Sequence, residues 1–154
     1  MGNRAVITFA KKPNRNSLGI YLHWNGGPES ILAFVEAADK FKIRFGEESY
    51  ALARLTQIIG NFFGGRTSIG VGTLARLDCD NGDNGIYRVF TTTDGSRLIF
   101  QCKRGWNPGA KWTEIDYAAA RNHLYWRPTR PFDKPIVDQI IAANQSFFVD
   151  ERDV

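Results

Sequence analysis

Two consecutive segments of this chain carry apolar residues at helical spacing, and each segment needs a surface on which to bury that stripe. The stripes are Ile31, Val35, Ala38 and Phe41 in the first segment, and Ala51, Leu55, Ile58, Ile59 and Phe62 in the second. Pro28 suits a first helical position, and Gly64 offers the left-handed conformation that ends a helix. We therefore expect helices over 28–41 and 47–63 that cover one face of a β-sheet.

Strands for that sheet are predicted on both sides of the helices. Before them, Arg4–Phe9 and Leu18–Trp24 are rich in β-branched and aromatic residues, which predicts a hairpin. The connecting loop, residues 10–17, contains the cations Lys11, Lys12 and Arg15. After the helices, residues 67–103 predict a three-stranded antiparallel meander, with strands over 67–77, 86–93 and 96–103.

The turn at Asp94-Gly95 sets the expected register of the last two strands, because this dipeptide favours a tight two-residue hairpin. Val89 then faces Phe100, and Arg88 faces Gln101. On its other side, Arg88 is expected to face Arg76. The core face of these two strands is expected to carry Tyr87, Val89, Phe100 and Cys102.

The cysteines and histidines limit metal and disulfide chemistry. In the expected meander Cys79 lies two strands from Cys102, about 9–10 Å away, which is beyond the reach of a disulfide. We therefore expect two free thiols. A four-ligand metal site would need both cysteines to meet both histidines, His23 and His123, so we expect no metal site.

The rest of the chain predicts a short helix over 114–124, an extended connector over 127–133 and a final helix over 134–147. A chain of 154 residues with 43% apolar content suffices for one core. We therefore expect a single α+β domain over 1–154, in which an antiparallel sheet packs against three or four helices. A monomer is favoured.

The apolar stretches are too short to cross a bilayer, so we expect no contact with a membrane. The sequence from Met1 to Arg4 does not begin the apolar run of a secretory signal, which favours a cytoplasmic protein.

Three motifs suggest catalytic or ligand-binding chemistry, and each lacks a necessary part. Asp78–Gly85 lacks the glycine and the final acid that a calcium loop needs. Gly26-Gly27 precedes a helix, but no Walker pattern is present and Glu29 would repel a phosphate. Neither His23 nor His123 has an obvious acidic partner or an activated nucleophile. We expect no catalytic residue, no cofactor and no enzymatic activity.

The most suggestive segment is 97–130, where basic and aromatic residues alternate. Guanidinium and indole groups serve equally in RNA recognition and at protein interfaces. The alternative is that the tryptophans fold back onto the core. The expected partner-binding residues, including two arginines of the meander, are Arg76, Arg88, Lys103, Arg104, Trp106, Lys111, Trp112, Arg127 and Arg130. The net charge of +4 permits an anionic partner without requiring one.

A second hint comes from the outer face of the expected meander. Arg76 and Arg88 share it with Leu74, Phe90 and Ile99, a row too apolar for bare surface. Either the C-terminal segment or a partner must cover this row, and we favour the C-terminal segment.

The first half of the chain resembles a family of short proteins, mostly of unassigned function, that occur in bacterial genomes, phages and mobile elements. The resemblance rests on Gly2–Phe9, on Gly19–Gly27 and on Asn61–Gly65. It implies a setting in which small proteins disarm bacterial immunity, anti-CRISPR inhibitors among them. It carries over no catalytic motif.

Two functional hypotheses follow. The first is a non-enzymatic phage or mobile-element protein of the anti-CRISPR type, acting in the host cytoplasm. It would occupy the surface of a CRISPR effector or another defence ribonucleoprotein complex. The alternative is a sequence-tolerant nucleic-acid-binding protein that uses the segment 97–130.

Overall fold

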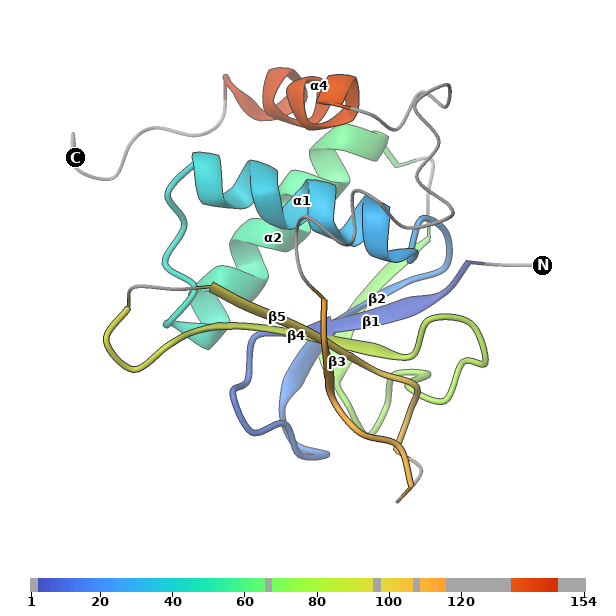
Figure 1. The fold of residues 1–154 in the computed structure, drawn as a ribbon. Coiled ribbons are helices and arrows are strands. Elements are labelled where there is room, and N and C mark those ends of the chain that lie inside the picture. Colours follow the sequence, from blue (N-terminus) through green and yellow to red (C-terminus); the bar gives the residue numbers. More distant parts are fainter. Residues whose placement is uncertain (1–2, 66–67, 96–97, 107–108, 116–133, 147–154) are drawn as a thin grey trace.

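The computed structural model of this protein describes residues 3–65, 68–95, 98–106, 109–115 and 134–146 (Figure 1). The strands are β1 (Ala5–Thr8), β2 (Leu18–Leu22), β3 (Ile69–Thr73), β4 (Ile86–Thr91), β5 (Leu98–Lys103) and β6 (Thr113–Glu114). The helices are α1 (Pro28–Lys40), α2 (Glu48–Phe63) and α4 (Lys134–Asn144). This is the expected α+β single-domain fold.

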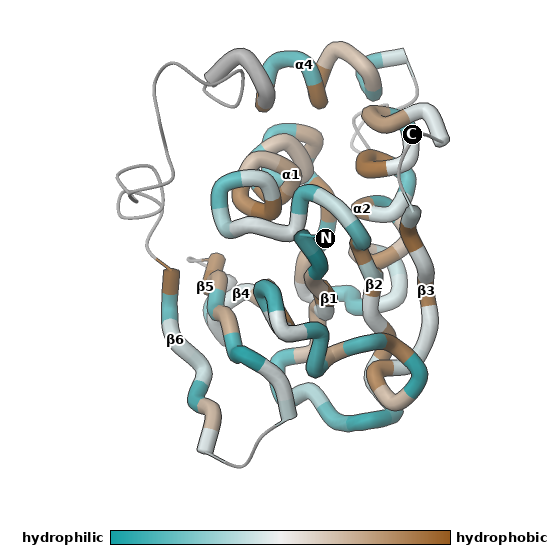
Figure 2. The backbone as a smooth tube through the Cα atoms, turned by 90° about the vertical axis from the view of Figure 1, so that its right-hand side faces the viewer, coloured by the Kyte–Doolittle hydropathy of each residue, from teal (hydrophilic) through white to brown (hydrophobic). Residues whose placement is uncertain are grey.

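The strands form one six-stranded sheet in the order β3-β2-β1-β4-β5-β6, which Figure 2 shows nearly end-on. All neighbouring pairs are antiparallel except β1 and β4, which run parallel. The expected N-terminal hairpin is confirmed, with Ile7 opposite Ile20. The sheet is therefore a mixed sheet in which most pairs are antiparallel.

The expected three-stranded meander is wrong, because β3 pairs with β2 and not with β4. The four residues of β1 are fully buried, so β1 is covered on both faces and pairs on both edges. A strand of that kind belongs in the middle of a sheet. The consequence is that Arg76, in the turn after β3, does not face Arg88.

The β4–β5 hairpin has the expected register. Val89 pairs with Phe100, and Arg88 pairs with Gln101. The turn depends on Gly95, whose φ of 72° is a left-handed conformation, and its N–H donates to the carbonyl of Thr92. The expected core face of this hairpin is confirmed, because Tyr87, Val89, Phe100 and Cys102 all pack in the main core.

Helices α1 and α2 cover one face of the sheet, as expected (Figure 1). Pro28 opens α1, and Gly64 ends α2 with a φ of 60° and an N–H bond to Gly60. The main core forms between these helices and the sheet, and its largest fully buried side chains include Phe34, Ile31, Leu55, Ile58, Ile59, Ile7, Ile20 and Leu22.

Helix α4 forms a third layer on the outer side of α1 and α2 (Figures 1 and 2). Its buried residues Val137 and Ile140 extend the main core. Asn144 is fully buried there, and its amide bonds to Asn61 and to the carbonyl of Ile58 on α2. This part of the C-terminal segment therefore lies on the helices. Our expectation that the segment covers the outer face of the sheet is wrong for α4.

The expected helix over 114–124 does not begin at Glu114, because Thr113–Glu114 pairs with β5 as strand β6. The expected final helix over 134–147 ends earlier, at Asn144. Residues 116–124 of the expected short helix, the connector over 127–133 and Phe147 lie outside the described residues.

The sheet face away from the helices has a second, smaller core. Val6, Leu74, Cys79 and Ile86 are buried in it, with Trp106 and Trp112 packed against them. The segment between β3 and β4 therefore covers part of this outer face. Both cysteines are free thiols. In the described part of the chain, no helix is long and apolar enough to cross a membrane.

Candidate functional site

Beside this second core, basic and aromatic side chains from distant segments form one continuous row on the outer face of the sheet. Arg88 and Phe90 come from β4. Successive side chains of a strand point to opposite faces, and Tyr87 and Val89 point into the main core, so Arg88 and Phe90 project away from the helices. The complete row, which we call the cation–aromatic ladder, is Lys11, Phe90, Arg88, Trp112, Lys103 and Trp106.

Cations and rings alternate along the ladder. The guanidinium carbon of Arg88 lies 5.3 Å from the ring centre of Phe90 and 4.4 Å from that of Trp112. Lys103 Nζ lies 5.9 Å from Trp112 and 5.4 Å from Trp106. At the other end, Lys11 Nζ is 5.9 Å from Phe90. Contacts of this kind contribute about 0.5–1 kcal/mol each at exposed sites, so they hold the row in place.

The described groups that bind the guanidinium of Arg88 are neutral. Its Nε donates to Gln101 Oε1 at 2.6 Å, and its Nη1 donates to the carbonyl of Lys11 at 3.1 Å. Partial burial lowers the pKa of Arg88. Within the described part of the chain, Arg88, Lys103 and Lys11 form no ion pair with an acidic residue. The ladder therefore presents cations that no described carboxylate pairs with, beside apolar rings.

Acidic groups border the ladder at two places. Glu114 of β6 pairs with Gln101 and so lies on the same face, at the rim of the sheet. Asp80 accepts a hydrogen bond of 2.8 Å from the backbone N–H of Trp106. This bond ties the loop after β5 to the segment before β4 and so positions Trp106 at its end of the ladder.

The indole of Trp106 reaches inward toward the second core. Its Nε1 is buried and has no hydrogen-bond partner among the described residues. It lies beside Cys79, where burial raises the pKa of the thiol to about 11. Trp106 therefore serves partly as cover for the core, and part of our alternative for the tryptophans is correct.

Four of the nine expected binding residues come together in the ladder, namely Arg88, Lys103, Trp106 and Trp112. Arg76 and Lys111 are exposed and are not part of the ladder. Arg104 instead donates to the carbonyl of Asp83. Arg127 and Arg130 lie outside the described residues.

Two ladder residues were absent from the expected set. Phe90 is two residues from Arg88, and strand alternation alone places it on the same face. Lys11 could not be placed without the parallel pairing of β1 with β4, in which Thr8 faces Arg88. This pairing brings the loop after β1 beside the outer face of β4.

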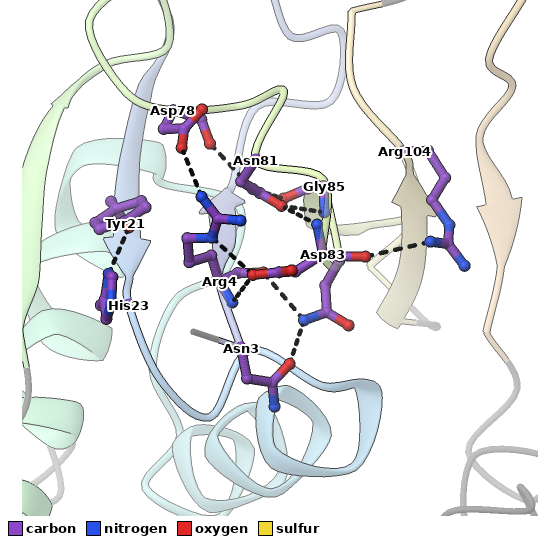
Figure 3. A network of polar contacts seen from close by, with 10 residues as sticks. Asn3, Arg4, Tyr21, His23, Asp78, Asn81, Asp83, Gly85 and Arg104 are labelled. Carbon is purple, nitrogen blue, oxygen red and sulfur yellow. Dashed lines mark hydrogen bonds and ion pairs between the residues drawn. The ribbon is translucent and has the colours of Figure 1, made fainter. Parts of the chain in front are cut away.

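A separate polar network holds the segment before β4, and Figure 3 shows it from close by. Arg4 Nε donates to Asp83 at 2.7 Å, and Arg4 Nη1 lies 3.7 Å from Asp78. The hydrogen bond from Arg4 holds the pKa of Asp83 below its usual range. Asn81 is buried and bonds to backbone groups of this segment, including the N–H of Gly85. Asp78 and Asp83 therefore serve to hold the loop before β4 in place.

His23 belongs to the same region. Its Nδ1 lies 2.9 Å from the hydroxyl of Tyr21 (Figure 3). Its ring meets that of Trp24 edge to face. No group of three or more potential metal ligands occurs among the described residues. His123 lies outside them.

Comparisons of the chain with protein-family models, with curated proteins and with solved structures gave no match.

Proposed function

We propose that this protein is a non-enzymatic binding protein that holds a nucleic-acid single strand on its cation–aromatic ladder. The observation that carries the proposal is the alternation of Lys11, Arg88 and Lys103 with three aromatic rings on one face of the sheet. Phosphates pair with the cations, while bases stack on the rings and on the guanidinium plane. This chemistry reads no particular base sequence.

A single strand fits this face better than a duplex or an acidic protein surface. The ladder crosses β4 and β5 inside a six-stranded sheet, so it offers a broad surface and not a single projecting element that would enter a groove. A protein surface would have to alternate acidic and apolar groups at the spacing of the ladder in order to contact both the cations and the rings. Unpaired bases use both, since each base brings a phosphate and a flat apolar face.

The test is fluorescence anisotropy with a labelled mixed-sequence single strand at low salt. We expect the wild type to bind and the double variant Arg88→Gln, Lys103→Gln to lose affinity by about tenfold or more, because two phosphate contacts disappear. Lys40→Gln is the matched control, since Lys40 is an exposed cation at the end of α1, on the helix side of the sheet. Equal binding by the double variant and the control contradicts the proposal.

The defence-inhibitor hypothesis becomes more specific in this light. An RNA-guided effector displaces a DNA single strand, and a protein that binds this strand or the exposed guide would obstruct interference. The resemblance of the first half of the chain supplies the setting for this second proposal. A plasmid-challenge assay tests it: we expect the wild type to relieve CRISPR interference and the Arg88→Gln, Lys103→Gln variant to fail. Undiminished interference with the wild type refutes the inhibitor role and leaves strand binding to its own test.

A further inference from the structure

The two edges of the sheet differ in how well they are protected from pairing. Strand β6 is only two residues long, and both residues are exposed and polar. At the other edge, β3 has five residues, Ile-Gly-Val-Gly-Thr, without a charge or a proline. A long, uncharged edge is a template for another strand. Val71 is 54% exposed on β3, and its neighbour Leu18 on β2 is 45% exposed.

The backbone pattern shows which groups of β3 face outward. The backbone N–H of His23 donates to the carbonyl of Ser68, and the backbone N–H of Leu74 donates to the carbonyl of Ser17. Even-numbered residues of β3 therefore bond to β2, because hydrogen-bonded pairs alternate in an antiparallel ladder. The N–H and C=O groups of Ile69, Val71 and Thr73 point away from the sheet. The carbonyl of Thr73 already accepts from the N–H groups of Arg76 and Leu77 in the following turn, so Thr73 contributes only its N–H at this edge.

From this edge we infer that the protein forms a homodimer through antiparallel pairing of β3 with β3 of a second copy, centred on Val71. The sequence of β3 is close to symmetric about Val71, with a glycine on each side. A two-fold axis there sets Val71 opposite itself and Ile69 opposite Thr73. The three outward-facing residues then lie opposite one another, for about four new hydrogen bonds, because the carbonyl of each Thr73 is already occupied. An axis centred at Gly70 or Gly72 also pairs outward groups with each other, but it leaves Thr73 or Ile69 opposite a residue outside β3 and does not bring the two exposed Val71 side chains together.

The side chains agree with this pairing. Val71 lies on the helix side, opposite Ile20, so two copies would bring their exposed valines together beside Leu18. On the outer side, Gly70 and Gly72 carry no side chain that would hinder a second strand. Because the axis is perpendicular to the sheet, both cation–aromatic ladders would lie on the same side of one continuous sheet. The inference does not depend on what the ladder binds.

Mutants that place like or opposite charges at the axis test the register directly. We expect the wild type to sediment at twice 17.4 kDa at micromolar to sub-millimolar concentrations. Val71→Lys alone and Val71→Glu alone should each shift to the monomer mass, because like charges then face each other. An equimolar mixture of the two should return to the dimer mass. Thr113→Lys, which adds the same charge at the opposite edge, should remain dimeric.

Each result of the sedimentation experiment decides the inference. A monomeric wild type at every concentration overturns it, as does a dimeric Val71→Lys protein. Failure of the mixture to pair overturns the placement of the axis at Val71. Hydrogen exchange on the wild type gives a second measurement that needs no variant. The amides of Val71 and Thr73 should become more protected as concentration rises, and unchanged protection contradicts the pairing.

Discussion

Replacing Asn144 by aspartate tests how α4 is attached, because the change adds a charge and leaves the volume almost unchanged. Asn144 is fully buried, and its Nδ2 donates to the carbonyls of Ile58 and Ile140 at 3.2 and 2.8 Å. Its Oδ1 accepts from Asn61 at 2.9 Å. A carboxylate keeps the bond from Asn61 and turns both donated bonds into repulsions. Two lost hydrogen bonds cost about 1 kcal/mol each, and the buried charge raises the total to about 3–5 kcal/mol.

The cost of Asn144→Asp depends on pH in a defined direction. Burial beside two carbonyls raises the pKa of the new carboxyl in the folded state above its unfolded value. The penalty is therefore small below the unfolded carboxyl pKa and grows as pH rises through the raised folded value. A protonated carboxyl still donates one hydrogen bond, so the remaining loss at acid pH is about 1 kcal/mol.

Urea unfolding of the wild type and the variant at acidic and neutral pH measures this difference. Gln145→Glu is the matched control, because it adds the same charge at the next position, which is exposed. We expect the control to stay within about 0.5 kcal/mol of the wild type at both pH values. If Asn144→Asp is as stable as the wild type at neutral pH, the buried hydrogen bonds of Asn144 do not exist as described.

Three further perturbations have outcomes fixed by the structure. Gly85→Ala should destabilise the fold by about 2 kcal/mol or more in urea unfolding, because φ is +71° and a Cβ would collide with the backbone at the end of β5. The thiols of Cys79 and Cys102, whose pKa burial raises to about 11, should alkylate slowly at pH 8 and rapidly in urea; fast labelling of the folded protein would contradict their burial. The ionised Asp83 stabilises the fold above its unfolded pKa, and this stability is lost as pH falls through its lowered folded pKa. Asp83→Asn should therefore make the free energy of unfolding fall less steeply at acid pH. An unchanged acid dependence would argue against the bond from Arg4.

Local patterns predicted the elements of this fold well. The apolar spacing and the flanking residues Pro28 and Gly64 placed α1 and α2 within about one residue of each end. Asp94-Gly95 fixed the β4–β5 register, since a tight turn leaves little choice of pairing. Arg88 on the outer face then followed from strand alternation alone.

The pairing of strands that are distant in the sequence could not be predicted from local patterns. Nothing local to β3 states whether it joins β2 or β4, and the useful signal lay in β1, whose unbroken burial marks a central strand. The position of Lys11 beside β4 depends on the pairing of β1 with β4. The expectation that Arg76 faces Arg88 was wrong for the same reason, because β3 pairs with β2. Asn144 is polar and sits near the end of a helix, so its sequence context resembles a surface position. Its role emerges only when α4 meets α2.

The account rests most on the cations of the ladder, and the salt dependence of single-strand binding tests them most directly. Three phosphate contacts predict a slope of about −2 in a plot of log affinity against log salt, or about a twentyfold loss between roughly 50 and 200 mM. Arg88→Gln should reduce the slope by about 0.7, while Lys40→Gln should leave it unchanged. An affinity that does not respond to salt, or a slope that Arg88→Gln leaves intact, would contradict the central claim.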